Sequence, residues 1–122
     1  MVIKHFKIAG RELSLNLPDK AAFWVFEEIF ENRDYRLLDE ILKSAKVVFD
    51  VGAHVGLFSI YAGLLNDRVK IYAFEPIEDN FLILKENLKK NGIKNVIAKN
   101  LALGSVSGMR EIYVNEDSHN HS

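Results

Sequence analysis

The 122-residue sequence predicts an α/β fold in which helices flank a parallel β-sheet, preceded by a hairpin and a helical lead-in. Three observations support this prediction. The apolar, β-branched runs 46–51 and 69–74 are typical of buried strands. Each run is followed by a segment of helical length. The connections are short, and strand–helix–strand units of this kind place their strands parallel with right-handed crossovers.

Residues 1–45 are expected to form the lead-in, which begins with a hairpin. The segments 3–8 and 12–17 alternate apolar and polar residues on either side of "AGR", a pattern typical of two short paired strands. Pro18 ends this unit.

Two helical stretches are expected to follow the hairpin. Asp19 is placed to cap the first, and apolar side chains recur at helical spacing over 20–30. Trp24 and its aromatic neighbours are expected in the core rather than in an aromatic site. After "ENRD", a second helical stretch carries apolar residues over 37–42.

The region 46–115 is expected to be the sheet-forming unit. Strand 46–51 is apolar at adjacent positions, which predicts burial on both faces, and 69–74 reads in the same way. Between them, the segment 57–65 has the length of a helix.

The second half of this unit continues the alternation. Residues 79–92 form an amphipathic pattern, with Asp79 or Asn80 as the expected cap and Gly92 as the left-handed end. A third strand is expected over 95–103, which gives three core strands.

Beyond the third strand, Gly104 and Gly108 bracket a predicted turn. The segment 110–114 is expected to begin a fourth, antiparallel strand. The polar residues 116–122 are expected to form a disordered tail. His119 and His121 lie two apart in it, but no third ligand is in sight, so no metal site is predicted.

Composition narrows the classes of function. A net charge of −1 offers no basic surplus, so nucleic acid is not expected as a partner. The chain has no cysteine, which excludes disulfides, thiolate metal sites and a cysteine nucleophile. No apolar run reaches the roughly 18 residues of a membrane span, and the first residues do not resemble a signal peptide. The predicted location is the cytoplasm, with no membrane partner.

The stretch "FDVGAHVG" is the predicted ligand site, because ligands of parallel sheets bind beyond the carboxyl ends of the strands. Gly52 permits a tight turn with positive φ. Gly56 lets the first turn of the next helix approach a strand or a ligand closely. The unpaired N–H groups of that helix terminus are available there.

A dinucleotide is one interpretation of this turn. The G-x-G-x-x-G pattern of Rossmann domains needs a second glycine where pyrophosphate meets the backbone. His54 occupies that position here, and Leu57 stands at the third glycine. The turn contains no Arg or Lys, and the P-loop pattern is absent.

A ligand without phosphates fits the residues better. The carboxylate of Asp50, at the strand end, is expected in the cleft, where it suits an ammonium group. Glu75 ends the second strand about twenty residues past the glycine turn, where an acidic residue accepts the hydroxyls of a ribose. A ribose with an attached ammonium group describes S-adenosylmethionine.

Four motifs in register resemble the FkbM family of class I S-adenosylmethionine-dependent methyltransferases. That family typically reads D-V-G-A-N-x-G, then F-E-P with a following Asn-Phe pair, then L-x-x-N-x-x-x-N-G, and then an A-L-G turn. This chain has "DVGAHVG", "FEPIEDNF", "LKENLKKNG" and "NLALGSVSG", in that order. The resemblance runs from about Phe23 to Gly108, and His54 replaces the usual Asn.

The resemblance implies a Rossmann-like sheet and methyl transfer from S-adenosylmethionine, often to a hydroxyl of a small molecule or glycan. The glycine turn would hold the methionine side, Glu75 the ribose, and residues after the second and third strands the adenine. The cofactor-binding residues expected on this basis are Asp50, Gly52, Ala53, His54, Gly56, Glu75, Pro76, Ile77, Ala102 and Leu103. No residue is assigned as a general base.

Two alternatives remain open at this stage. A non-catalytic Rossmann remnant would bind a partner, and an NAD-dependent oxidoreductase is disfavoured by His54. The family sheet has seven strands, so the chain is expected to be its N-terminal part only. The strand 46–51 would then be an exposed edge, through which the chain could self-associate.

Overall fold

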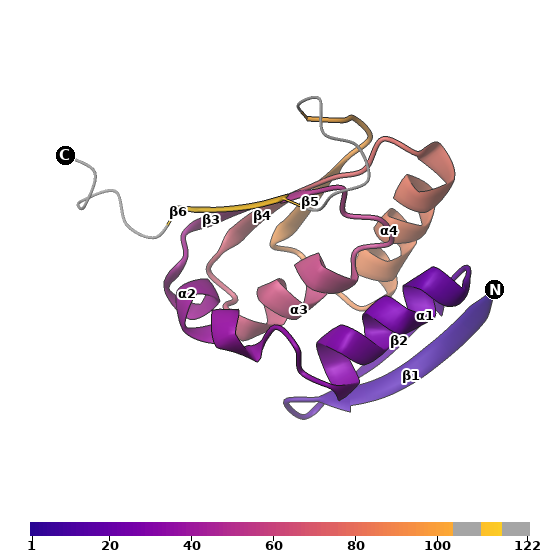
Figure 1. Ribbon diagram of the computed structural model, residues 1–122, viewed down its shortest axis with the longest axis horizontal. Coiled ribbons are helices and arrows are strands. Elements are labelled where there is room, and N and C mark those ends of the chain that lie inside the picture. Colours follow the sequence, from indigo (N-terminus) through magenta and orange to yellow (C-terminus); the bar gives the residue numbers. More distant parts are fainter. Residues whose placement is uncertain (104–110, 116–122) are drawn as a thin grey trace.

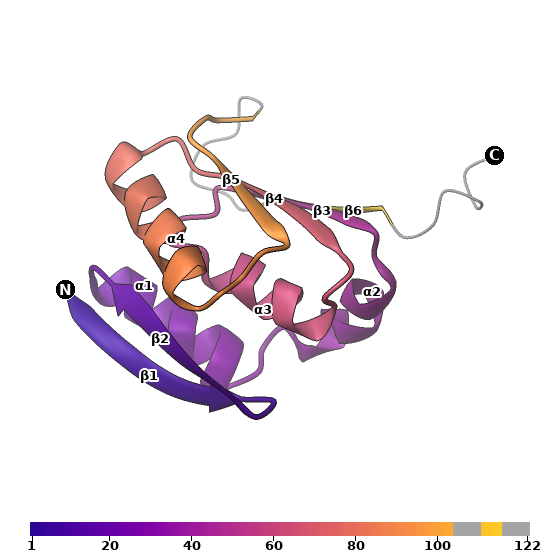
Figure 2. The ribbon, with the colours of Figure 1, turned by 180° about the vertical axis from the view of Figure 1, so that it is seen from behind.

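A four-stranded sheet in the order β5-β4-β3-β6 forms the centre of the molecule, and a two-stranded hairpin lies apart from it. The computed structural model describes residues 1–103 in full and the backbone of 111–115. Figures 1 and 2 show helices between the sheet and the hairpin. The elements are β1 Val2–Ile8, β2 Arg11–Leu17, α1 Lys20–Phe26, η1 Glu27–Glu31, η2 Arg36–Leu38, α2 Asp39–Ser44, β3 Val47–Val51, α3 Leu57–Leu65, β4 Lys70–Phe74, α4 Glu78–Lys90, β5 Val96–Lys99 and β6 Glu111–Asn115.

Three strands of the sheet are parallel, as predicted. In the register, Val48 of β3 lies beside Ile71 of β4, which lies beside Val96 of β5. The helices α3 and α4 make the crossovers between them, which confirms the expected strand–helix alternation. β5 ends at Lys99 and not at 103, because the amide of Asn100 turns back to the carbonyls of Glu75 and Pro76.

The fourth strand, β6, pairs antiparallel with β3 over its whole length, from Val47 opposite Asn115 to Val51 opposite Glu111. The prediction of a fourth antiparallel strand is therefore confirmed. The prediction that β3 is an exposed edge is wrong, because the chain itself returns to cover that edge. Self-association through it loses its basis. The predicted turn at Gly104 and Gly108 and the tail 116–122 lie outside the described residues.

The two faces of the sheet are packed differently. α2, α3 and α4 all lie on one side of it, and no helix of the described residues lies on the other (Figures 1 and 2). On the covered face Val48, Ile71 and Ala73 are fully buried. On the open face Phe49 is 36% exposed and packs edge-to-face against Tyr72 and Phe74. The prediction that β3 and β4 are buried on both faces is therefore wrong for these aromatic side chains.

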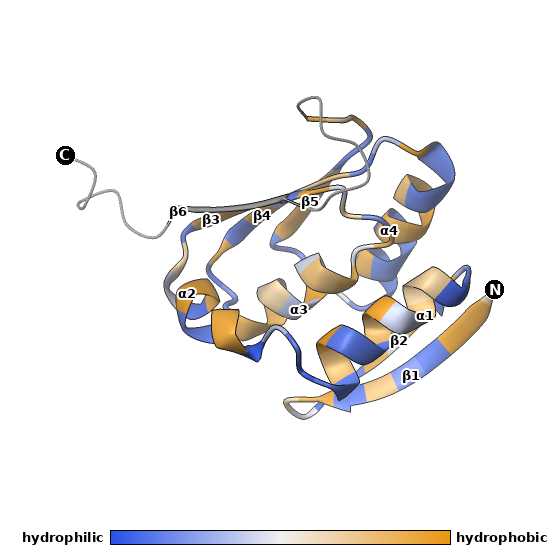
Figure 3. Ribbon diagram, in the orientation of Figure 1, coloured by the Kyte–Doolittle hydropathy of each residue, from blue (hydrophilic) through white to orange (hydrophobic). Residues whose placement is uncertain are grey.

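Helix α3 is the most deeply buried helix of the described part of the chain. Figure 3 shows it as predominantly apolar, and all residues from Leu57 to Gly63 are buried. This helix lies between the sheet and the lead-in, where Tyr61 meets the ring of Phe30 at 5.9 Å between centroids. It therefore joins both parts of the hydrophobic core.

The lead-in differs in detail from its prediction. Asp19 caps α1 as expected, with its Oδ1 accepting from the N–H of Ala22 at 2.8 Å. The predicted helix then continues as a π-helical turn, η1, closed by the N–H of Asn32 on the carbonyl of Glu27. Phe26 is buried, but Trp24 is 61% exposed and not part of the core.

The hairpin has the two-residue turn Ala9–Gly10 between its strands. Its inner face carries Phe6, which packs against Phe26 of α1 with ring centroids 5.4 Å apart. Its outer edge, on β2, contacts α4 through two asparagine side chains that are described below. The hairpin thus binds both the lead-in helix and the second crossover helix.

Candidate functional site

The glycine turn follows β3 and has a left-handed backbone at three residues. The φ angles are 75° at Gly52, 58° at His54 and 92° at Gly56. The N–H groups of Gly52 and Ala53 both donate to the carbonyl of Phe74 at 2.9 Å, which fixes the turn against the end of β4. The predicted positive φ of Gly52 is confirmed. His54 tolerates its conformation because His, like Asn, is enriched in the left-handed region.

Gly56 is required by two independent constraints. Its φ disfavours any side chain, and a Cβ placed there would lie 2.3 Å from Cδ1 of Leu84. Leu84 is fully buried on α4. The close approach expected of Gly56 is therefore an approach to the neighbouring crossover helix, which brings the start of α3 against α4.

Asp50 lies beneath the turn and not on its surface. Its side chain is fully buried, and its Oδ2 accepts from the hydroxyl of Ser59 on α3 at 2.7 Å. This differs from the expectation of a carboxylate in an open cleft. Asp50 sits on the covered face of β3, so its carboxylate meets the first turns of α3 and holds that helix.

Glu75 connects the glycine turn to the start of α4. Its side chain is 4% exposed. Oε1 accepts from the N–H of His54 at 2.7 Å, and Oε2 accepts from the N–H of Ile77 at 3.0 Å. A carboxylate oxygen has two acceptor positions, so each oxygen can accept a further hydrogen bond. Ile77 is the N-cap residue of α4, and no side chain caps that helix, so the predicted cap at Asp79 or Asn80 is wrong.

Apolar residues follow β4 and β5 at the end of the sheet where Glu75 lies. Ile77 is 58% exposed and Leu103 37% exposed, and Pro76 and Ala102 are also exposed. Asn100 joins the two segments that carry them, because its amide donates to the carbonyls of Glu75 at 2.9 Å and Pro76 at 3.1 Å. Apart from Asp50, which lies on β3 itself, the predicted site residues follow the carboxyl ends of β3, β4 and β5.

Two residues at this site escaped the sequence prediction. Asn100 could have been suspected as the first polar residue after a strand. Asn87 of α4 is fully buried, and its amide donates to the carbonyl of Val55 in the glycine turn at 3.0 Å. The only signal for it is its position in "LKENLKKNG", one of the four motifs that resemble the FkbM family.

A charged cluster joins α3 to the lead-in. The hydroxyl of Tyr61, which is 1% exposed, donates to Asp39 and accepts from Arg33 at 3.2 Å. Burial raises the pKa of Tyr61 above its ordinary value, and the hydrogen bond to Asp39 adds to the effect. No cluster that could hold a metal ion occurs among residues 1–103.

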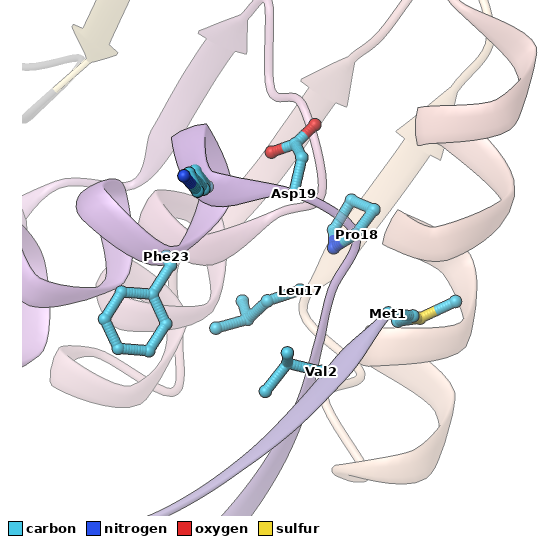
Figure 4. Close-up of a pocket in the computed structure, with 7 residues that line it drawn as sticks. Met1, Val2, Leu17, Pro18, Asp19 and Phe23 are labelled. Atoms are coloured by element: carbon cyan, nitrogen blue, oxygen red, sulfur yellow. The ribbon is translucent and has the colours of Figure 1, made fainter.

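An apolar pocket lies at the open end of the hairpin, outside the predicted site. It has a volume of about 340 Å³, and Figure 4 shows Val2, Leu17 and Phe23 around it. Pro18, Met1, Asp19 and Lys20 complete its lining. No predicted cofactor residue contributes to it.

Comparison with known proteins supports the sequence prediction in part. No family model matches the chain. It is 32% identical over 91 residues to the 31-O-demethyl-FK506 methyltransferase FkbM of Streptomyces tacrolimicus, covering 75% of this chain and 35% of that protein. It is 34% identical over 88 residues to the methyltransferase sdnD of Sordaria araneosa, covering 71% and 33%.

Among solved structures, the SAM-dependent methyltransferase from Agrobacterium tumefaciens superimposes with a TM-score of 0.58 at 15% identity. The match covers 80% of this chain and 32% of that one. The chain thus spans about a third of the length of each of these three proteins. The likeness confirms the predicted Rossmann-like α/β fold. None of the helices in the described part of the chain has the length and apolar character needed to cross a bilayer.

Proposed function

We propose that this chain is the cofactor-binding part of a class I S-adenosylmethionine-dependent methyltransferase of FkbM type. The observation that carries the proposal is the position of Glu75. Its buried carboxylate joins the glycine turn to the start of α4 and keeps acceptor capacity on both oxygens. An FkbM methyltransferase and a second methyltransferase are similar in sequence over most of this chain, which supports the assignment.

The residues present fit this cofactor. Glu75 would accept the ribose hydroxyls, and Ile77 and Leu103, with Pro76 and Ala102, would contact the adenine. Gly52, Ala53, His54 and Gly56 would form the methionine side, where the turn contains no Arg or Lys to receive a phosphate. Asp50 would act from beneath, by holding α3 through Ser59.

S-adenosylmethionine would supply the methyl group, carried on its sulfonium, and the chain would supply binding and orientation. Methyl transfer depends mainly on holding donor and acceptor in line. We propose a hydroxyl of a small molecule or glycan as the acceptor, in accord with the name of the FkbM relative, a 31-O-demethyl-FK506 methyltransferase. A cytoplasmic location and the absence of nucleic acid among the partners remain predictions from composition.

The competing assignment is an NAD-dependent oxidoreductase. His54 opposes it, because the side chain stands where a dinucleotide site has its second glycine. His54 has a left-handed backbone, and its N–H donates to Glu75. This N–H is therefore bound to a carboxylate of the chain itself.

The test is calorimetric titration of the chain with S-adenosylhomocysteine, for the wild type and for Glu75→Gln and Glu78→Gln. Glu78 is an exposed carboxylate in the first turn of α4, so it is the matched control. We expect Glu75→Gln to weaken binding by about tenfold or more, the effect of impairing a charged hydrogen bond. Glu78→Gln should change it by less than about twofold. Binding of NAD in place of S-adenosylhomocysteine would contradict the proposal.

A further inference from the structure

Asn87 uses its whole amide group to join two distant parts of the chain. Its Oδ1 accepts from the N–H of Asn16 at 2.8 Å. Its Nδ2 donates to the carbonyl of Asn16 at 3.2 Å and to that of Val55 at 3.0 Å. Asn16 lies on β2 of the hairpin and Val55 in the glycine turn, and Asn87 itself is fully buried.

Asn91, four residues further on and the C-cap residue of α4, provides a natural comparison. Its Oδ1 accepts from the N–H of Ser14 at 2.8 Å, and its Nδ2 donates to the carbonyl of Ser14 at 2.9 Å and to that of Asn87 at 2.7 Å. Both asparagines therefore bind β2 in the same way, with two hydrogen bonds to one residue of that strand, and each makes a third hydrogen bond elsewhere. Only Asn87 also contacts the glycine turn.

The contact to Val55 fixes one particular peptide group. The carbonyl of Val55 and the N–H of Gly56 belong to the same planar unit. Asn87 holds the carbonyl, and the N–H donates to the carbonyl of Ala53 at 3.0 Å. With both ends bound, this peptide group is restrained from rotating, and it precedes the first residue of α3.

We propose that Asn87 is a positioning residue for the cofactor turn, and that through it the β1–β2 hairpin and the turn are energetically coupled. The proposal rests on the proposed function only where it concerns cofactor affinity. Coupling of this kind is reciprocal. Displacement of the hairpin should therefore lower the affinity for the cofactor by the same factor by which bound cofactor favours the docked hairpin.

The first test needs no ligand. We would measure hydrogen exchange of the Gly56 N–H in the wild type, in Asn87→Ala and in Asn91→Ala. Each variant removes three side-chain hydrogen bonds. Position 87 lies within α4, where Ala is a good helix former, and position 91 is the C-cap of that helix. We expect exchange at Gly56 to accelerate about tenfold more in Asn87→Ala than in Asn91→Ala. Equal acceleration in both variants would overturn the positioning role.

The second test measures the affinity for S-adenosylhomocysteine in the same three proteins, with thermal unfolding as the check on stability. Both variants should lose similar stability, whereas only Asn87→Ala should weaken binding, by about tenfold. Similar weakening in both would show a purely structural effect and overturn the coupling. If the wild type does not bind at all, the proposed function fails, and Gly56 exchange still decides the role of Asn87. If Asn87→Ala does not fold, Asn87→Ser and Asn91→Ser replace the pair.

Discussion

Two of the turns with a left-handed backbone, the hairpin turn and the glycine turn, have surroundings that are opposite in kind. In the hairpin turn, Ala9 and Gly10 have φ angles of 50° and 78°, and nothing lies within 4 Å of a Cβ placed on Gly10. In the glycine turn, a Cβ on Gly56 would collide with Leu84. The first turn only reverses the chain between two strands, whereas the second is enclosed on several sides.

The difference shows what distinguishes a site from a simple turn. Positive φ at a glycine is common to both, so it carries no functional information by itself. The glycine turn is set apart by its partners, since Glu75 binds the N–H of His54 and Asn87 binds the carbonyl of Val55. Fixed backbone groups of this kind are preorganised for a ligand.

The largest effect is expected from placing one methyl group in each turn. Gly56→Ala combines an unfavourable φ with a collision against a buried leucine, and should lower the free energy of unfolding by about 3 kcal/mol. Gly10→Ala meets only the unfavourable φ and should cost about 1 kcal/mol. Urea unfolding of the two variants measures both values.

A double-mutant cycle separates the two components of the Gly56→Ala effect. Leu84→Ala should itself cost about 3 kcal/mol by leaving a cavity. Combined with Gly56→Ala, the total should fall short of the sum by about 1–2 kcal/mol, because the new methyl group occupies part of that cavity. Strict additivity would contradict the packing explanation and leave only backbone strain.

A smaller effect is expected at His54, the non-glycine residue inside the glycine turn. His54→Val places a β-branched side chain in a left-handed conformation and should cost about 1–2 kcal/mol. His54→Asn should change the free energy of unfolding by less than about 0.5 kcal/mol, since Asn accepts this conformation. Equal losses in the two variants would mean that the imidazole itself stabilises the turn.

The secondary structure could be predicted from the sequence more completely than the contacts of the candidate site. The strands and crossover helices were predictable because their apolar patterns are local, as in the amphipathic helix Glu78–Lys90. The exposure of Phe49 was not predictable, because the sequence does not show which face the helices cover. The role of Asn87 depends on residues about 30 and 70 positions away in the chain, and no local pattern encodes such contacts.

A substitution in the hairpin turn is expected to stabilise the protein, whereas those considered in the glycine turn are not. Two-residue hairpin loops with positive φ at both positions favour Asn followed by Gly, and here Ala stands in the first position. Ala9→Asn should therefore raise the free energy of unfolding by about 0.5–1 kcal/mol, measured by urea unfolding. No gain would indicate that the hairpin is already constrained by its contacts with α1 and α4.

The smallest expected effect on stability appears only at alkaline pH, and it concerns Tyr61 on α3, the helix that follows the glycine turn. Burial raises the pKa of Tyr61, so the unfolded chain loses this proton near pH 10 while the folded chain keeps it. Stability is therefore unaffected below about pH 10 and falls as the pH rises through the folded pKa. Urea midpoints from about pH 9 to 11 should decline less steeply in Tyr61→Phe than in Tyr72→Phe, and parallel curves would disprove this.

Asn87 of α4 and Asn91 at its C-cap have a consequence for the behaviour of the protein in a crowded solution. A strand edge with unpaired N–H and C=O groups is a template on which other chains aggregate. On β2 the outward groups of Ser14 and Asn16 are all taken by the amides of Asn91 and Asn87. Side chains of a helix here replace a neighbouring strand, and they close the edge without extending the sheet.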